Sequence, residues 1–241
     1  MTMTKHFLLN PKINGFDMLQ AIIFDMDGVI VDTEFLEYDL QAQFIESIKE
    51  HDHTLTPLER SEVVGKGLSE IPEIVKKLSG SSLPLEEIKQ RYFDFFNQLF
   101  ATVDYPSIFR TDIQRIINFA KQNHIKLAVA SSSRLEHIQN ILTKCGIIQH
   151  FDFIVSGEQF ERSKPDPTIY RYTLEKLGVQ AQNAVAIEDS FFGIQAAKSA
   201  GIPVIAYEEK RMHIDQSQAD YCGKDMNEIL TIIQKLHHSS Y

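Results

Sequence analysis

Five short apolar runs, each long enough for one buried strand, constrain this chain more than any other feature of its sequence. They cover residues 19–24, 126–130, 151–155, 184–187 and 203–206. Continuous apolar runs of this length are typical of strands that are buried on both faces. Helical patterns separate the last four runs, and strands that alternate with helices form a mostly parallel, covered sheet. The sequence therefore predicts an α/β fold with a Rossmann-like parallel-sheet core.

Start and stop signals bound the helices expected between these strands. A capping-box pair and an Asp-Pro pair are expected to begin two of them, and glycines are expected to end three. The starts are Ser133 with Glu136 and Asp166 with Pro167, and the stops are Gly146, Gly178 and Gly201.

The stretch between the first and second runs differs, because residues 33–104 show helical periodicity and no convincing strand. Apolar stripes at helical spacing are expected to pack against one another as a bundle. The stripes are Leu36, Leu40, Phe44 and Ile48, then Leu85, Ile88, Tyr92, Phe95 and Leu99, with a further helix start at Thr56, Pro57 and Glu59.

This interruption divides the chain into two expected domains. Residues 18–32 and 105–241 are expected to form the α/β core, and residues 33–104 an inserted helical-bundle cap. Residues 1–17 are interpreted as an N-terminal extension before the first strand.

Charge and composition exclude several classes of protein. A formal net charge of -9 gives no general attraction for nucleic acid or anionic membranes. The sequence has no apolar run long enough to cross a membrane, and residues 1–17 lack the apolar stretch of a secretion signal, so we expect a cytoplasmic protein. Cys145 and Cys222 have no metal-ligand spacing and are expected to be free thiols.

Two carboxylates follow the first apolar run, in the sequence Asp25-Met26-Asp27-Gly28. Ligands of open α/β sheets bind outside the carboxyl ends of the strands, so these side chains are expected to face a site. Asp25 could attack phosphorus and form an aspartyl phosphate, and Asp27 could exchange protons with the leaving oxygen and with water. A carboxylate repels a phosphate oxygen, so a cation is required, and Mg²⁺ suits oxygen ligands.

Matching groups stand at or beyond the ends of later strands. Glu188 and Asp189 follow the run at 184–187 and could bind the metal. A hydroxyl and backbone N–H groups at Ser131 and Ser132 could hold phosphate oxygens, and the ammonium of Lys164 could neutralise the phosphoryl group. Each group alone is common in proteins. Their order along the chain, each at the end of a strand or in a loop beyond one, favours a shared site.

The motifs together resemble those of the haloacid dehalogenase superfamily. They are DMDGVIVDTE at residues 25–34, the serine at 131, KPDP at residues 164–167 and IEDS at residues 187–190. The inserted helices resemble the subgroup with a small helical cap, which includes beta-phosphoglucomutases and sugar-phosphate phosphatases. The resemblance runs from about residue 19 to the end of the chain.

This resemblance implies a role for each matching position. Asp25 is expected to be the nucleophile and a magnesium ligand, and Asp27 the acid/base, with its backbone carbonyl on the metal. Further positions are expected to bind the phosphoryl group (Ser131 and Lys164, with Ser132 beside them) or the metal (Asp189, with Glu188 beside it). Dehalogenases and phosphonate hydrolases of the family lack the second aspartate, so Asp27 favours phosphoryl transfer.

Substrate contacts are expected from the cap. The loop that contains Gly65 and Lys66 matches the cap loop that meets the site in this subgroup, and Arg134 lies beside the phosphate-binding serines. Beta-phosphoglucomutases are expected to carry an arginine at Leu68 and a histidine at Glu37. Because both are missing, hydrolysis is favoured over mutase chemistry, although Lys66 could replace the arginine.

Three functions from different classes follow. The first is a Mg²⁺-dependent phosphatase that hydrolyses a small phosphorylated metabolite, in a protein expected to be a monomer. The second is a hexose-phosphate mutase that needs a bisphosphate primer. The third is a non-enzymatic receiver switched by phosphorylation of Asp25, which the long helical insert disfavours because receivers are compact.

Overall fold

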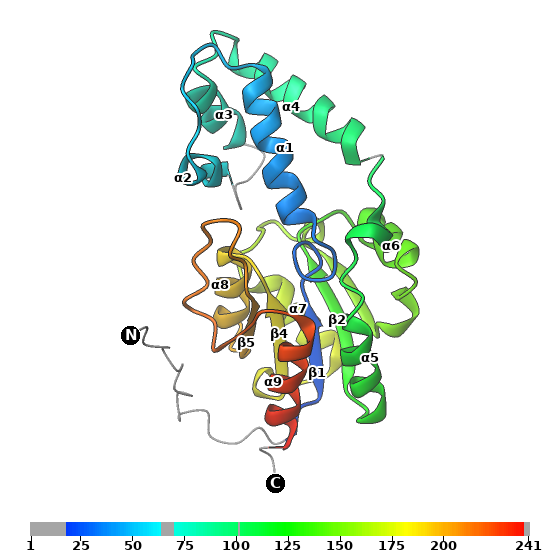
Figure 1. Ribbon diagram of the computed structural model, residues 1–241. Coiled ribbons are helices and arrows are strands. Elements are labelled where there is room, and N and C mark those ends of the chain that lie inside the picture. Colours follow the sequence, from blue (N-terminus) through cyan, green and yellow to red (C-terminus); the bar gives the residue numbers. More distant parts are fainter. Residues whose placement is uncertain (1–17, 64–69, 101, 239–241) are drawn as a thin grey trace, which may run out of the picture.

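The computed structural model describes residues 18–63, 70–100 and 102–238. Within them, six parallel strands form one sheet in the order β3-β2-β1-β4-β5-β6, with β1 near its centre (Figure 1). The strands are β1 Ala21–Phe24, β2 Lys126–Ser131, β3 Phe153–Ser156, β4 Ala184–Glu188, β5 Val204–Tyr207 and β6 Tyr221–Gly223. The predicted α/β fold is confirmed, and every predicted strand is present.

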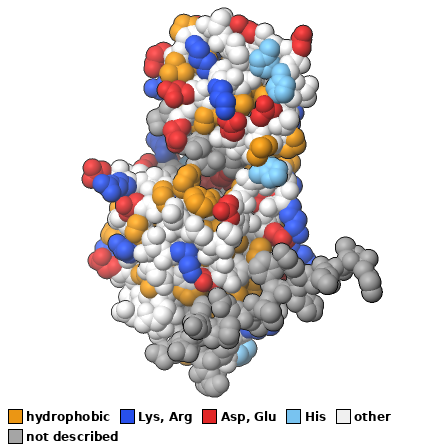
Figure 2. Space-filling view, turned by 90° about the vertical axis from the view of Figure 1, so that its left-hand side faces the viewer, with side chains coloured by type: hydrophobic (Ala, Val, Ile, Leu, Met, Phe, Trp, Pro, Cys, Tyr) orange, Lys and Arg blue, Asp and Glu red, His pale blue; other side chains and the backbone are white. Residues whose placement is uncertain are grey.

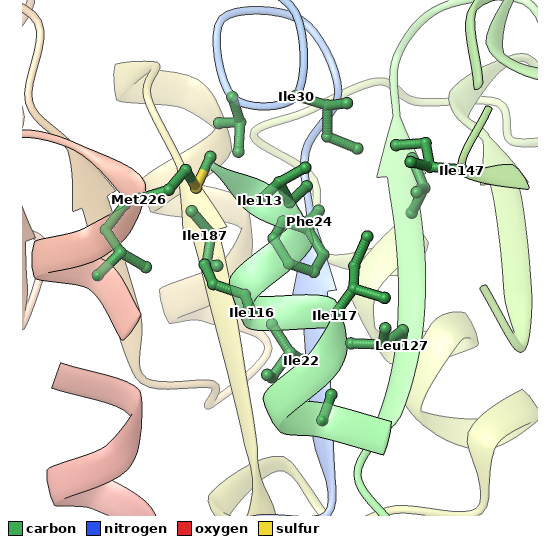
Figure 3. Close-up of a cluster of buried hydrophobic side chains, with 14 of the residues drawn as sticks. Ile22, Phe24, Ile30, Ile113, Ile116, Ile117, Leu127, Ile147, Ile187 and Met226 are labelled. Carbon is green, nitrogen blue, oxygen red and sulfur yellow. The ribbon is translucent and has the colours of Figure 1, made fainter. Parts of the chain in front are cut away.

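Helices cover both faces of the sheet, as buried apolar strands require. One face packs against α5 Ile113–Gln122, α6 Leu135–Lys144 and α9 Met226–His238, and the other against α7 Thr168–Leu177 and α8 Phe191–Ser199. In β1, Ile22 and Phe24 enter the first layer and Ala21 and Ile23 enter the second. Figure 3 shows the first layer, where isoleucines of α5 surround Phe24.

A separate helical bundle stands over the carboxyl ends of the strands (Figure 1). It consists of α1 Thr33–Ser47, α2 Pro57–Arg60, α3 Ile71–Ser79 and α4 Leu85–Phe100. Its buried side chains form their own cluster, which includes Phe44, Val75 and Ile88. The helix start predicted at Thr56, Pro57 and Glu59 is present in α2, where Thr56 and Glu59 form a capping box.

Short 3-10 helices complete the described secondary structure. They are η1 Ser61–Val63, η2 Tyr105–Ile108, η3 Ile148–His150, η4 Gly157–Gln159 and η5 Ala181–Asn183. Among the described residues, no helix has both the length and the apolar character that crossing a membrane requires. The N-terminal extension predicted at residues 1–17 lies outside the described residues.

Two helix starts differ from the prediction. The capping box at Ser133 and Glu136 is wrong, because Arg134 is the N-cap and the N–H of Leu135 donates to Glu158 instead (3.1 Å). The next helix starts one residue later than predicted, with Pro167 at the N-cap. Asp166 still accepts from the N–H of Thr168 (2.9 Å), so its capping role is kept.

Candidate active site

Asp25 occupies the first position after β1, where the central strand ends. Its N–H donates to the carbonyl of Ile187 in β4 (2.9 Å), which continues the sheet ladder and fixes the backbone. Its side chain is buried, and the residue is only 7% exposed. A carboxylate so placed loses most of its hydration, and a partner of opposite charge is required.

Lys164 is that partner, although it lies 139 residues further along the chain. Its Nζ donates to Asp25 Oδ1 (2.6 Å), to Glu188 Oε1 (2.7 Å) and to the carbonyl of Ala130 (3.0 Å). All three donor positions of the ammonium are therefore used, and its side chain is 7% exposed. The loop before α7 thus brings a positive charge to the ends of β1, β2 and β4.

Glu188 ends β4 and is fully buried. Its Oε1 also accepts from the hydroxyl of Tyr170 (2.5 Å), and its Oε2 from Ser190 at the start of α8 (3.4 Å). Tyr170 belongs to α7 and is itself fully buried. The carboxylate is therefore held from two helices.

Asp189 completes a cluster of three buried carboxylates. One oxygen each of Asp25, Glu188 and Asp189 lies within 4.8 Å of the others. Gly28 makes room for it: its φ is +77°, and a Cβ there would lie 1.8 Å from Asp189 Oδ2. The glycine after the second aspartate is thus needed both for the turn and for the close approach.

Asp27 points to a different set of partners, which are hydroxyl groups. Its Oδ1 accepts from Thr33 (2.7 Å), and its Oδ2 accepts from Ser133 (2.7 Å) and from Ser131 (3.4 Å). Thr33 opens α1 of the helical bundle. Asp27 therefore lies between the sheet and the bundle.

The remaining predicted site residues divide into two groups. Ser132 is exposed, with its hydroxyl 3.4 Å from that of Ser163. The guanidinium of Arg134 is 81% exposed and lies 4.0 Å from Glu158, so the structure does not bring it to the carboxylates described above. Gly65, Lys66 and Leu68 lie outside the described residues.

Negative charge exceeds positive charge at the cluster, with three carboxylates against the single ammonium of Lys164. Burial, and then the carboxylates of Glu34, Asp25 and Glu188, raise the pKa of Asp189 well above its usual range. Burial and the carboxylates of Asp27 and Glu188 likewise raise the pKa of Glu34 to about 7. A further cation would relieve this excess.

The donor set fits a hard divalent cation. All three candidate ligands are carboxylates, which Mg²⁺ and Ca²⁺ prefer over the nitrogen or sulfur donors that soft metals take. The cluster is buried at the end of a sheet, so its ligands are held in place before any ion binds. The residues present therefore could hold a metal ion.

Several residues of this site have no place in the sequence-based prediction. Ser133 was interpreted as a helix cap, yet its hydroxyl donates to Asp27 across 106 residues. Tyr170 belongs to an apolar helix stripe, and only the fold brings its hydroxyl to Glu188. Thr33 and Glu34 lie within the motif at residues 25–34, which is the one signal that could have drawn attention to them.

Comparison with known proteins identifies the family of this chain. Residues 22–207 match the family described as haloacid dehalogenase-like hydrolase. The chain belongs to this family. A phosphorylated carbohydrates phosphatase of Thermotoga maritima is 32% identical over 186 residues, which are 76% of this chain and 82% of that protein. A beta-phosphoglucomutase of Bacillus subtilis is 32% identical over 76% of this chain and 81% of its own.

A solved structure with a similar fold supports this family assignment. The putative beta-phosphoglucomutase from Thermotoga maritima has a TM-score of 0.68 at 28% identity, covering 90% of this chain and 99% of its own. The predicted family and the predicted enzyme class, a hydrolase of the phosphatase type, are confirmed. A non-enzymatic receiver is not supported.

Gly193 gives a first testable prediction for this haloacid dehalogenase-like site. It lies in α8, where alanine would ordinarily favour a helix by about 1 kcal/mol. A Cβ there would lie 2.0 Å from Glu188 Oε2, and the carboxylate is fully buried. Gly193→Ala is therefore expected to destabilise the protein by about 1–3 kcal/mol in urea unfolding.

The matched control for Gly193→Ala is Gln195→Ala in the same helix. It is expected to leave the free energy of unfolding unchanged within about 0.5 kcal/mol. A stabilised Gly193→Ala variant would mean that Glu188 does not pack against this helix.

Proposed function

We propose that the chain is a Mg²⁺-dependent phosphatase that hydrolyses a small phosphomonoester through a phosphorylated Asp25. One observation carries the proposal: Asp25 is buried at a strand end, held by Lys164 at 2.6 Å, with two further carboxylates within 4.8 Å. A structural ion pair would not need this surplus of negative charge. Residues 33–104 act as a cap over the site.

In the first step, Asp25 is the nucleophile. One of its carboxylate oxygens forms a bond to phosphorus while the ester P–O bond breaks. Asp27, in its acid form, donates its proton to the leaving oxygen, which departs as an alcohol. Lys164 and Ser131 hold the phosphoryl oxygens as charge shifts onto them.

In the second step, water attacks the phosphorus of the aspartyl phosphate. Asp27, now a carboxylate, takes a proton from that water, and the bond between phosphorus and Asp25 breaks. Inorganic phosphate leaves, and both aspartates return to their starting states. Asp25, Asp189 and the carbonyl of Asp27, with Glu188 beside them, would hold Mg²⁺, which would offset the repulsion between carboxylate and phosphate.

A phosphorylated sugar is the proposed substrate class. The Thermotoga maritima relative is named a phosphorylated carbohydrates phosphatase, and it covers most of this chain at 32% identity. Glu34 and Glu37 lie on α1 of the bundle, half-buried near Asp27, and carboxylates there can accept hydrogen bonds from sugar hydroxyls.

A hexose-phosphate mutase is the second candidate, because one relative of equal identity is named a beta-phosphoglucomutase. Glu37, where such a mutase is expected to carry histidine, favours hydrolysis. A mutase would interconvert sugar 1- and 6-phosphates in the presence of a bisphosphate primer. Coupled assays that detect only free phosphate would reject it.

The direct test is release of inorganic phosphate from hexose and pentose phosphates, with Mg²⁺ and with a chelator. The proposal expects hydrolysis of at least one sugar phosphate with Mg²⁺ and none with the chelator. Absence of hydrolysis from every ester, in a folded sample that binds Mg²⁺, would contradict it.

The stabilising effect of Mg²⁺ is expected to depend on pH. Since the pKa of Asp189 is raised in the folded protein, the contribution of this carboxyl to the stability of the metal-free fold is fully present below about pH 4 and is lost as pH rises. Metal binding needs the deprotonated carboxylate, so it opposes this loss.

Saturating Mg²⁺ is therefore expected to raise the thermal midpoint by about 5 °C at pH 8 and by clearly less at pH 5. Scanning calorimetry with and without chelator measures both shifts. Equal shifts at the two pH values, or none, would exclude the buried carboxylates as ligands.

A further inference from the structure

The loop between β5 and β6 is firmly attached to the ends of two strands. In this loop, the amide nitrogen of Gln216 donates to the carbonyls of Asp189 (2.6 Å) and Tyr207 (2.7 Å). Its amide oxygen accepts from the N–H of Glu209 (3.1 Å). Because Gln216 bonds both strand ends and the loop itself, the loop is a rigid support beside the site.

Arg211 projects from this support toward the helical bundle. Its guanidinium forms a bidentate pair with Asp32, with Nη1–Oδ2 and Nη2–Oδ1 both at 2.7 Å. The carboxylate of Glu209 also accepts from Nε (3.0 Å) and Nη2 (2.6 Å) of this guanidinium. The side chain of Glu209 is only 6% exposed. The guanidinium is therefore fixed on both sides, in the geometry that arginine provides and lysine cannot.

The partners of Arg211 are the residues that begin the bundle. Asp32 precedes α1, and Phe35 in its first turn lies under the guanidinium, 4.1 Å from it. Figure 1 shows this loop, in orange after β5, rising toward the bundle. The N–H of His213 also reaches the hydroxyl of Ser61 in η1 (3.4 Å). The loop therefore contacts the bundle at points separate from the two chain segments that connect the bundle to the sheet domain.

A second arginine, Arg110, binds the same Asp32 carboxylate. It donates to Asp32 Oδ1 (2.9 Å), to the carbonyl of Gly28 (3.2 Å) and to the hydroxyl of Tyr207 (2.8 Å). Burial alone would raise the pKa of Asp32, but Arg211 and Arg110 lower it below its usual value, as expected for a carboxylate between two guanidinium groups. Of the two arginines, Arg211 also lies over the ring of Phe35 in α1.

The start of α1, which Arg211 holds, lies directly beside the proposed catalytic residues. Thr33, next to Asp32, donates to Asp27, and Glu34 packs over Gly28, where a Cβ would lie 3.0 Å from Glu34 Cγ. Figure 2 shows the crevice between bundle and sheet, with hydrophobic and acidic side chains gathered at it. The angle of α1 therefore sets how the bundle faces this crevice.

We propose that Arg211 is a positioning residue, which holds the bundle at the angle where a sugar phosphate bound to Asp25 also meets the cap. Arg211 has no contact with Asp25, Lys164 or Glu188, so its loss should not change chemistry on a substrate too small to meet the cap. The kinetic part of this inference rests on the proposed function; the structural part does not.

The structural test measures the distance between bundle and sheet by pulsed electron paramagnetic resonance. Nitroxides are placed on exposed Cys222 in β6 and on Phe93→Cys in α4, in a Cys145→Ser background. Arg211→Gln is expected to broaden or shift the distance distribution of the full chain, and Lys210→Gln is the matched control. A distribution unchanged by Arg211→Gln would overturn the proposal.

The kinetic test compares the best sugar phosphate with acetyl phosphate. Arg211→Gln is expected to raise KM for the sugar phosphate about three- to tenfold and to leave acetyl phosphate hydrolysis unchanged. Arg211→Lys should lie between the two, because it restores charge without the bidentate geometry. Equal losses of kcat on both substrates would show a merely structural role. Failure of the phosphatase proposal is distinct, since wild type would then hydrolyse neither compound.

Discussion

Asp25→Asn is expected to lower phosphate release by roughly four orders of magnitude or more, because the amide cannot attack phosphorus. The substitution is nearly isosteric, and Lys164 keeps its bonds to Glu188 and to the carbonyl of Ala130. The variant should therefore fold. Steady-state assays and circular dichroism on the same sample separate lost chemistry from lost structure.

The matched control for this change is Asp166→Asn, a partly exposed position before α7. Its amide oxygen can still accept from the N–H of Thr168, so neither turnover nor the thermal midpoint should change. Turnover by Asp25→Asn comparable with the wild type would remove Asp25 as the nucleophile, whatever the rest of the site does.

Lys164→Met is expected to have the second largest effect, on both stability and turnover. Methionine has a similar length but leaves Asp25 and Glu188 buried without their cation. Breaking a buried ion pair from one side costs about 3–5 kcal/mol, and loss of the charge facing the phosphoryl group should lower kcat by about 100-fold or more. Urea unfolding at pH 7 measures the first, and steady-state assays measure the second.

The pH dependence of Lys164→Met follows from the sign of the change. Lys164 lowers the pKa of Asp25, which burial raises, so its removal raises that pKa further. The folded variant then binds protons that the unfolded chain does not, and its stability falls as pH rises above about 4. The deficit against wild type should shrink at pH 5. Lys198→Met, which breaks the surface pair with Asp220, should cost less than about 1 kcal/mol.

Much of the sheet could be predicted because its information is local. Each of the five predicted strands is a run of mostly apolar residues, and several of these runs end at a polar residue. Asp25, Ser131 and Glu188 are the polar residues at or directly after three such ends. Since parallel strands end at one edge, their convergence follows from the order of the runs alone.

The errors arise where a local pattern has a distant partner. Ser133 and Glu136 have the spacing of a capping box, but the hydroxyl of Ser133 instead donates to Asp27, 106 residues away. The role of the Tyr170 hydroxyl could not be predicted, because Tyr170 lies among the apolar residues of α7 and only the fold brings its hydroxyl to Glu188. Local periodicity carries no information about such pairs.

The sequence predicts the helices of the bundle but not how the bundle is attached to the sheet domain. Its stripes identify which side chains form its core, as Phe44 and Ile88 do. Its attachment through Arg211 and Asp32 joins residues 179 apart in the sequence, and no spacing rule indicates it. Which cap residues contact a substrate depends on that attachment.

The most direct test of the account is to trap the phosphorylated enzyme. The protein is mixed with the sugar phosphate that it hydrolyses best, quenched in acid within one turnover, digested and analysed by mass spectrometry. The account predicts one phosphoryl group, on the peptide that contains Asp25 and on the Asp25 carboxylate itself. A phosphoryl group on any other residue, or turnover with no phosphorylated peptide during a measured burst, would contradict it.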